Sequence, residues 1–372
     1  MERGAGLVPL QLFGPPTGRI VTSLKLAESH GLLGRLTDTI RVLCPSNKPI
    51  LVTGAHRSGS TWVGRMIASH WRVKYYSEPF NPEHADCPTR VYFHYMTPED
   101  EPRFIAYLKP AFQLRSLGKS GTSRLKSLHT AWRLGKSACR STFCRLGGRP
   151  LFKDPMALLS AEWLAHRFGT ETIVLIRHPA AFASSLKRLN WHFPFADFLG
   201  QTRLMEDHLE VFRGAIEQFA HNPPDIVDQS ILLWRILHSM IQRYRSRHPD
   251  WQFVRHEDIS VQPMEEFGKL FKALGLSFTP RVARTIAEYT DGDNPAEAME
   301  GVVHQLKRDS RGNIWNWTHR LSRDEIHRIR SGTEDVAQHF YAPSYWNPPA
   351  PVKCKVYISR PRFVFGGLRA FS

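Results

Sequence analysis

A loop near the start of the chain constrains its fold more than any other feature of the sequence. An apolar run at residues 49–53 leads into Gly54, and Gly59 follows five positions later with Ser60 and Thr61 behind it. This spacing matches the phosphate-binding loop G-x-x-x-x-G-K-[ST], which joins a strand to a helix, except that Ser60 stands in place of the lysine. Backbone N–H groups and the helix dipole still bind an anion in such a loop. We therefore expect the ligand to be a phosphorylated nucleotide other than ATP.

Strand and helix patterns alternate through most of the chain after this loop. Short extended runs are predicted at residues 50–53, 73–77, 172–176 and 252–255, and a further short run ends at Lys153. Helices are predicted at residues 61–70, 156–168, 180–189, 226–247, 264–274, 281–289 and 323–337. Asp154 and Ser322 are expected to cap two of these helices. The alternation predicts an α/β fold, a P-loop-type three-layer sandwich in which helices flank a central parallel sheet.

The sequence predicts one main domain with additions at both ends. A helical extension with a helix at residues 21–42 covers residues 1–48, the main domain covers 49–342, and a basic tail covers 343–372. A basic insertion lies at about residues 100–150, because residues 102–152 contain no Asp or Glu but eleven Lys or Arg. We interpret the insertion either as a solvated helix pair or as a lobe that binds the acceptor or a membrane surface. A nucleic-acid site is the weaker alternative, since no base-reading module is recognisable.

The charge balance predicts an anionic partner. The chain carries 50 Lys and Arg against 34 Asp and Glu, a formal net charge of +16. No apolar run approaches the roughly 18 residues of a membrane span, and no basic segment followed by an apolar one marks the N-terminus. We therefore expect a cytoplasmic protein. Its five cysteines are odd in number and scattered, which predicts reduced thiols rather than a disulfide framework.

Cationic side chains stand where predicted strands end. Arg57 lies inside the loop, Lys153 precedes a capped helix, and Arg177 follows the most apolar strand, with Ser185 eight residues further on. Ligands of parallel sheets bind beyond the carboxyl ends of the strands, and arginine pairs with phosphate through two hydrogen bonds. These positions therefore predict one anion site. The alternatives are structural: an ion pair of Lys153 with Asp154, and a surface ion pair of Arg177.

A basic loop before the last predicted helix holds two further candidates. It covers residues 307–312 and contains Arg308 and Ser310. Such a loop can fold over a bound nucleotide. The alternative is a solvated run of charges.

Together these motifs resemble the sulfotransferases that use 3′-phosphoadenosine-5′-phosphosulfate (PAPS), in particular the bacterial, carbohydrate- and tyrosylprotein-sulfotransferase branches. The resemblance covers about residues 49–340. It is carried mainly by Arg57-Ser58-Gly59-Ser60-Thr61-Trp62 and by Arg177-His178-Pro179 with Ser185. Weaker matches are Ser77-Glu78-Pro79, Lys153-Asp154-Pro155, Arg255-His256-Glu257-Asp258 and Arg308-Asp309-Ser310.

The resemblance implies a PAPS site that needs no metal. Its 5′-phosphosulfate would be bound by the loop residues Arg57, Ser58, Gly59, Ser60 and Thr61. The other parts of the nucleotide would be bound by Trp62 at the adenine, Arg177 and Ser185 at the 3′-phosphate, and Arg308 and Ser310. PAPS has no γ-phosphate, which accounts for the missing loop lysine.

The resemblance also implies transfer of the sulfonyl group to an acceptor hydroxyl, with Arg57 and Lys153 neutralising the charge that develops. Glu78, at the end of the second strand, is our candidate for the general base, and His56 and His178 are alternatives. Glu78 as a merely structural partner of Arg57 is a further alternative. We expect the acceptor to be a carbohydrate, a glycolipid or another small metabolite, and the basic insertion favours an anionic one.

Two other classes of function stay open at this point. A P-loop kinase or NTPase acting on ATP is one, although the loop lysine and a strand-end aspartate for Mg²⁺ are missing. The other is a non-catalytic protein that binds a polyanion or a membrane surface through residues 103–149.

Overall fold

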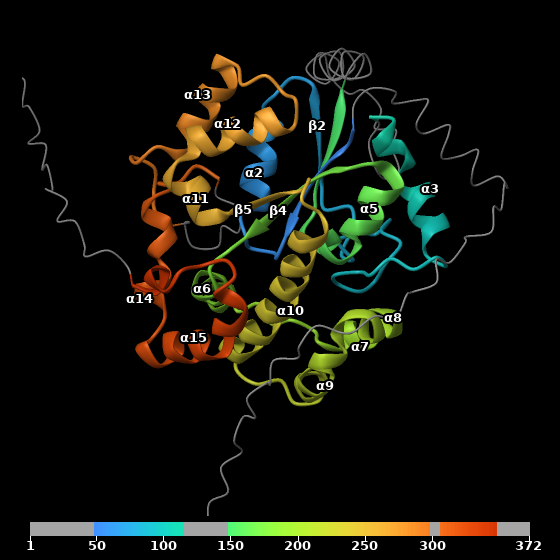
Figure 1. Ribbon diagram of the computed structural model, residues 1–372, viewed down its shortest axis with the longest axis vertical. Helices are drawn as coiled ribbons and strands as arrows, with labels where there is room; N and C mark the ends of the chain where they lie inside the picture. The colour runs from blue at the N-terminus through green and yellow to red at the C-terminus, as the bar shows by residue number, and fades with distance from the viewer. Residues whose placement is uncertain (1–47, 115–147, 298–305, 348–372) are drawn as a thin grey trace, which may run out of the picture. The chain divides into compact units, whose positions relative to one another are not determined.

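The computed structural model describes residues 48–114, 148–297 and 306–347 (Figure 1). The chain divides into two units, Met1–Leu43 and Cys44–Ser372, and the described residues all belong to the second. The predicted helix at 21–42, most of the basic insertion and most of the basic tail lie outside the described residues. Within the described part, no helix is both long and apolar enough to cross a membrane.

A five-stranded parallel sheet forms the centre of the second unit. Its strands are β1 (Ile50–Gly54), β2 (Val73–Ser77), β3 (Arg149–Lys153), β4 (Glu171–Ile176) and β5 (Gln252–Arg255). They lie in the order β2-β3-β1-β4-β5, and every neighbouring pair is parallel. The predicted α/β fold with a parallel sheet is therefore confirmed. All carboxyl ends lie at one edge, where such folds bind their ligands.

One face of the sheet is covered by the helices that follow β1 and β5. These are α2 (Ser60–Ile67), α11 (His256–Val261), α12 (Pro263–Ala273) and α13 (Pro280–Thr290), all on one side in Figure 1. Alternate strand residues such as Ile50, Val52 and Leu151 point toward them and share a buried core with Phe267 and Phe271. This packing fixes the loop between β1 and α2 against the start of α11.

The opposite face carries α5 (Ala161–Phe168) and the long helix α10 (Ile226–Arg247), seen on the other side of the sheet in Figure 1. Tyr244 of α10 is fully buried, and its hydroxyl donates to the carbonyl of Leu158 at 3.1 Å. Helices α6 (Pro179–Leu189) and α15 (Arg323–Ala337) pack against α10 and against each other. Helices thus lie on both faces, as the alternation predicts.

Two predicted caps form, and one predicted helix is wrong in its first half. The Asp154 carboxylate accepts from the backbone N–H of Met156 at 3.0 Å, and Ser322 forms a capping box with Glu325. The predicted helix at 156–168 begins instead as the 3₁₀ helix η1 (Pro155–Ser160), and only α5 is α-helical. The side-chain cap therefore starts a tighter turn than the pattern suggests.

Several short elements have no clear signal in the sequence. They are α3 (Glu101–Phe112), α7 (Ala196–Leu199), α8 (Thr202–Leu204), the π-turn η2 (Met205–Leu209), η3 (Glu210–Phe212), α9 (Arg213–His221), η4 (Gly312–Trp315), α14 (Trp317–Arg320) and η5 (Pro343–Trp346). Most are too short to show a helical period.

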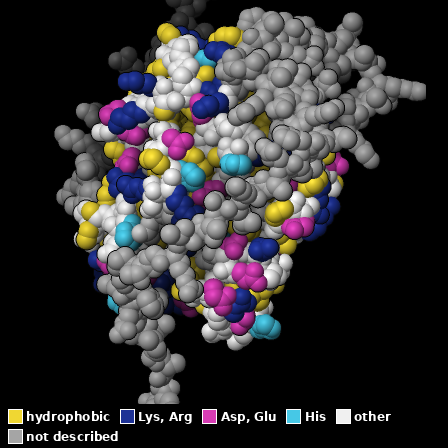
Figure 2. All heavy atoms as spheres, turned by 45° about the vertical axis from the view of Figure 1, so that its right-hand side comes forward, with side chains coloured by type: hydrophobic (Ala, Val, Ile, Leu, Met, Phe, Trp, Pro, Cys, Tyr) yellow, Lys and Arg dark blue, Asp and Glu magenta, His cyan; other side chains and the backbone are white. Residues whose placement is uncertain are grey.

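The described ends of the basic insertion are not a free basic surface. Arg103 of α3 forms an ion pair with Asp100. Arg149 of β3 is buried, and its guanidinium donates to the carbonyls of Lys48 at 2.7 Å and Leu274 at 2.5 Å. On the face drawn in Figure 2, charged side chains of both signs lie interspersed among the described residues.

Candidate functional site

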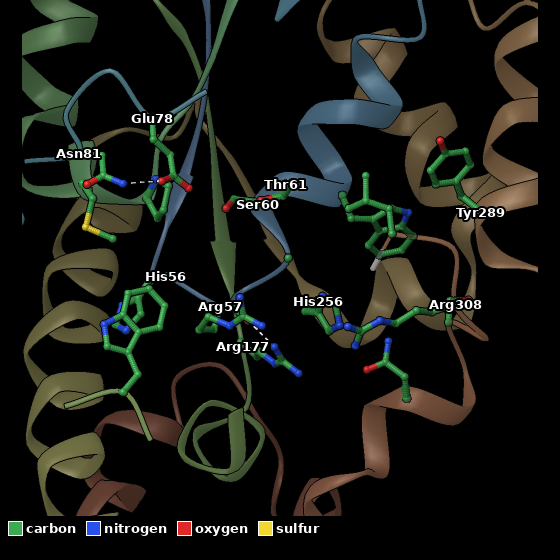
Figure 3. Close-up of a pocket in the computed structure, with 18 of the residues that line it drawn as sticks. His56, Arg57, Ser60, Thr61, Glu78, Asn81, Arg177, His256, Tyr289 and Arg308 are labelled. Atoms are coloured by element: carbon green, nitrogen blue, oxygen red, sulfur yellow. Dashed lines mark hydrogen bonds between the residues drawn. The ribbon is translucent and has the colours of Figure 1, made fainter. Parts of the chain in front are cut away.

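A pocket of about 310 Å³ opens at the carboxyl edge of the sheet. Its lining comes from the β1–α2 loop, the ends of β2 and β4, the start of α11 and the segment before η4 (Figure 3). The predicted residues that line it are Arg57, Gly59, Ser60, Thr61, Trp62, Glu78, Arg177, Arg308 and Ser310. The fold thus brings together motifs as far apart in the chain as Arg57 and Ser310, which are separated by 253 positions.

Gly59 shapes the loop between β1 and α2. Its φ of 94° is in the left-handed region, and a Cβ atom at this position would lie 2.6 Å from Nδ1 of His256. No other residue therefore fits without displacing the buried imidazole. Ser58 is also buried, and its hydroxyl has no hydrogen-bond partner among the described residues. Such an orphaned donor within a glycine-shaped loop suits an anion that the loop would enclose.

Three arginines give the pocket its positive charge. The Arg177 guanidinium donates to the carbonyl of Arg57, and Arg57 Nε donates to the Ser185 hydroxyl at 3.1 Å. Burial, together with Arg177, Arg188 and Arg308, lowers the pKa of Arg57 to about 10. Burial also lowers the pKa of Arg177 to about 10, and its Nε has no hydrogen-bond partner among the described residues. A bound anion would relieve this repulsion and satisfy the buried donor.

Lys153 lies beneath the pocket rather than in its lining. It is 1 % exposed, and its ammonium group forms an ion pair with Glu78. The other Glu78 oxygen accepts from the Asn81 amide at 2.9 Å. Glu78 also holds a φ of 48°, a strained conformation for a residue with a side chain. Lys153 and Asn81 therefore hold the Glu78 carboxylate at the wall of the pocket, on a backbone in a strained conformation.

The expected structural alternative for Lys153, a pair with Asp154, is not what the structure shows. The Asp154 carboxylate instead accepts from the backbone N–H groups of Phe80 at 2.5 Å and Met156 at 3.0 Å. Burial raises the pKa of Asp154 to about 7. Because Phe80 follows Glu78 by two residues, Asp154 ties the Glu78 segment to the end of β3.

Ser58 and Ser185, like Lys153, are buried behind the lining. The Ser185 hydroxyl contacts Arg57 rather than the open cavity. Ser310 lines the pocket, yet its hydroxyl donates to the carbonyl of Ser260 at 2.8 Å. Trp62 lines the pocket with part of its ring, which also packs edge-on against His256 and Phe267.

The two histidines proposed as alternative bases have different surroundings. His56 lines the pocket between aromatic rings, and burial and Arg57 lower its pKa to about 3. His178 is outside the lining, stacked on Trp317 with a ring-centroid distance of 5.3 Å, and burial lowers its pKa to about 3. Both imidazoles are therefore neutral at pH 7.

The structure adds lining residues that sequence reasoning did not single out. They are Asn81, Glu83, Tyr92, Pro155, Met156, Trp191, His256, Tyr289, Leu306 and Asn313. Of these, His256 and Pro155 carried a signal, because each lies within a recognised segment directly after a strand. Among the described residues, no group of three or more His, Cys, Asp and Glu is placed to hold a metal ion.

Comparison with known proteins finds a family and a set of similar folds. A family model described as "Sulfotransferase family" matches residues 49–280. No curated protein sequence gives a significant match. Solved structures similar to the chain include a sulfotransferase domain from the curacin biosynthetic pathway, 14 % identical, which aligns over 79 % of this chain and 97 % of its own with a TM-score of 0.43.

Two further solved structures are similar at the same level. The sulfotransferase domain of the Synechococcus PCC 7002 olefin synthase is 16 % identical over 80 % of this chain and 98 % of its own, with a TM-score of 0.43. Mouse sulfotransferase SULT7A1, complexed with PAP, is 12 % identical over 82 % of this chain and 89 % of its own, with a TM-score of 0.39.

Proposed function

The chain belongs to the sulfotransferase family, and from this premise we propose that it transfers the sulfonyl group of PAPS to a hydroxyl group of a carbohydrate, glycolipid or other small acceptor. The observation that carries the donor assignment is the pair of partly buried arginines beside the glycine-shaped loop. The Arg177 guanidinium donates to the backbone carbonyl of Arg57, and its Nε has no partner among the described residues. Two guanidinium groups at one pocket wall suit a ligand with two anionic groups, and a nucleotide with phosphates on the 3′ and 5′ positions of its ribose supplies two.

Two groups of pocket residues would hold the two charged parts of PAPS. The loop from Arg57 to Thr61 would hold the phosphosulfate, because its glycine lets the backbone approach closely. Arg177 would hold the 3′-phosphate through its unpartnered Nε. Ser185 orients Arg57 in the present arrangement, and we propose that it exchanges this bond for a phosphate oxygen.

In the proposed reaction, the acceptor oxygen forms a bond to sulfur while the bond from sulfur to the bridging phosphate oxygen breaks. The electron pair leaves with 3′-phosphoadenosine-5′-phosphate (PAP), and Arg57 and the loop N–H groups stabilise the charge on that oxygen. The acceptor proton passes to Glu78. Lys153 holds the Glu78 carboxylate in place and adds positive charge beneath the transferred group.

Glu78 is a better candidate for the base than His56 on geometry. Both line the pocket, but the His56 imidazole is packed among aromatic rings beside Arg57, whereas the Glu78 carboxylate is held at the pocket wall by Lys153 and Asn81. We expect Glu78→Gln to lower kcat by about 10²-fold or more while PAP binding persists. Glu206→Gln, at an exposed position, is the matched control and should leave both unchanged.

Thermal unfolding with PAP, AMP and ATP–Mg²⁺ tests the donor, followed by transfer from labelled PAPS to an acceptor panel. We expect PAP to raise the melting temperature more than AMP does, because only PAP carries the 3′-phosphate. Equal stabilisation by AMP would contradict the role of Arg177. Stabilisation by ATP–Mg²⁺ but not by PAP would replace the proposal with an ATP-dependent one.

A further inference from the structure

The lining of the pocket has two chemically different ends. Figure 3 shows Glu78 and Asn81 on one side, Tyr289 and Arg308 on the other, and Arg57 between them. The lining arginines are Arg57, Arg177 and Arg308, so the described cations lie in the middle and at the far end. If the donor occupies the arginines, the acceptor must approach from the Glu78 side.

Four polar residues at the Glu78 end form one connected network. The Asn81 amide donates to Glu78 at 2.9 Å, and the Asn81 carbonyl accepts from the backbone N–H of Glu83 at 3.0 Å. The Tyr92 hydroxyl donates to Glu83 at 2.7 Å. Carboxylate and amide oxygens held in this way are suited to accepting several hydrogen bonds from neighbouring hydroxyl groups.

The charge at this end is negative. Lys153 balances Glu78, whereas the acidic Glu83 at the rim pairs with an uncharged tyrosine hydroxyl. Among the described residues that line the pocket, no lysine or arginine stands beside Glu83. Arg90 lies outside the lining and donates to backbone carbonyls on either side of Glu83, those of Pro82, His84 and Ala85. An anionic group inside the pocket at this end would therefore lie next to a carboxylate, at a cost in affinity.

An aromatic wall completes the same end. Trp191 lines the pocket and lies edge-on to His56, with a ring-centroid distance of 5.0 Å. A narrow recess continues the pocket between Tyr92, Phe93 and Trp191. Because His56 is neutral, this wall offers an apolar, uncharged surface to a ring that stacks on it.

We propose that the acceptor is a sugar ring that carries no anionic group, with its hydroxyls bound by Glu83 and Asn81 and its C–H face against Trp191. This inference rests on the proposed function, since it assumes that PAPS occupies the arginine end. The basic insertion instead favours an anionic acceptor. We infer the charge of the acceptor from the residues that line the pocket rather than from the net charge of the chain. The reacting hydroxyl is the one directed at Glu78.

Three aryl glycosides that differ in one group test the proposal: p-nitrophenyl β-glucoside, the corresponding glucuronide and the 6-amino-6-deoxy glucoside. Binding of each to the PAP-loaded protein is measured by saturation-transfer NMR, because the hydroxyl and amino groups can themselves accept a sulfonyl group whereas the carboxylate cannot, so that turnover would mix binding with reactivity. We expect the glucoside to bind about 5- to 10-fold more tightly than the glucuronide, and the amine to bind at least as tightly as the glucoside. A preferred glucuronide, an amine that binds more weakly than the glucuronide, or no glucoside binding at millimolar concentration would each overturn the proposal.

Two variants test whether Glu83 and Trp191 are responsible for the preference between the glycosides. Glu83→Gln should weaken glucoside binding about threefold and narrow the gap to the glucuronide, because a neutral amide accepts a weaker hydrogen bond and repels no anion. Glu206→Gln, exposed and outside the pocket lining, should change neither. Trp191→Ala should lower glucoside affinity about 10-fold. An unchanged glucoside-to-glucuronide ratio in Glu83→Gln would refute the assignment even if Trp191→Ala fails to fold.

Stabilisation by PAP distinguishes a failure of the proposed donor site from a failure of the proposed acceptor class. If PAP does not raise the melting temperature, the proposed donor site fails. If PAP binds but the glycosides rank otherwise, only the acceptor class fails.

Discussion

The two ends of strand β3 each carry a buried cation, and they treat it differently. At the amino end, Arg149 forms an ion pair with Glu171 and donates to the carbonyls of Lys48 and Leu274. At the carboxyl end, Lys153 pairs with Glu78, a residue in a strained conformation at the wall of the pocket. The first cation is surrounded by acceptors inside the protein, whereas the second supports a group that faces a ligand.

Arg177 extends this contrast to the neighbouring part of the sheet. Its guanidinium is partly exposed, unlike that of Arg149, but its buried Nε has no partner among the described residues, and the group donates to the carbonyl of another arginine. Burying an unsatisfied charged donor costs stability. The comparison teaches that the amino edge of the sheet stabilises the fold, while the carboxyl edge gives up stability for binding.

The largest expected effect is at the amino edge. Arg149→Ala should lower the free energy of unfolding by about 3 kcal/mol, because it leaves Glu171 and two carbonyl groups without their donor. We take the low end of the usual range since the Glu171 side chain keeps 33 % exposure. Urea unfolding measures the loss. PAP affinity below the unfolding transition should not change, and a loss of affinity would mean that Arg149 belongs to the site.

The converse is expected for Arg177. Arg177→Ala should lower PAP affinity by about 10²-fold, since charged hydrogen bonds to phosphate are lost. The stability of the free protein should fall less than in Arg149→Ala, because the substitution removes repulsion with Arg57 as well as the attraction between Arg177 and the buried Glu257. Calorimetry with PAP and AMP measures the effect, and AMP affinity should fall much less. Arg177→Lys, which keeps the charge but not the paired geometry, serves as the control; unchanged PAP affinity in both variants would break the comparison.

Much of the frame of the site could be predicted because its signals are local. The glycine spacing of the β1–α2 loop, the apolar run of β4 and the cap at Ser322 each lie within one short segment. The helix α10 and the strands β2 and β5 have the bounds that the sequence predicts. Residues adjacent in the sequence are enough to specify such loops, strands and caps.

What the sequence could not show are the partners. Glu78 and Lys153 meet because β2 lies beside β3, across 75 positions of the chain. Arg149 looks like one more positive charge of the basic insertion until the sheet buries it. Trp191 and Tyr92 carry no motif, and only the fold places their rings at one wall. Charges and aromatic rings acquire their roles from tertiary neighbours, which a single sequence does not display.

Two glycines with left-handed backbone conformations, Gly59 in the β1–α2 loop and Gly169 at the end of α5, test whether the loop belongs to the donor site. Gly59→Ala should destabilise the protein by about 2 kcal/mol and weaken PAP binding about 10-fold, because a Cβ atom would press on His256 in the loop itself. Gly169, with a φ of 63° and nothing within 4 Å of the position that a Cβ atom would take, is the matched control. Gly169→Ala should cost about 1 kcal/mol and leave PAP affinity unchanged. Equal effects of both variants on PAP binding would remove the loop from the donor site.

The smallest effect, counted per pH unit, concerns the acid next to Lys153. Burial raises the pKa of Asp154 from 3.8 to about 7. Between about pH 4 and pH 7 the folded protein therefore keeps a proton that the unfolded chain has lost, so this group makes the protein less stable as the pH rises. The slope is at most about 1.4 kcal/mol per pH unit.

Asp154→Asn should remove this slope, since an amide does not titrate and still accepts a hydrogen bond from a backbone N–H. Urea unfolding at several pH values between 4 and 8 gives the difference between the variant and the original protein. The lowered pKa values of His56 and His178 make both proteins more stable as the pH rises. This contribution is the same in both proteins, so it cancels in the difference, which reports Asp154 alone. Asp250→Asn, at an exposed position, is the control. Parallel pH profiles for Asp154→Asn and the original protein would show that the carboxyl edge holds Asp154 ionised, and that its contacts to Phe80 and Met156 stabilise rather than cost.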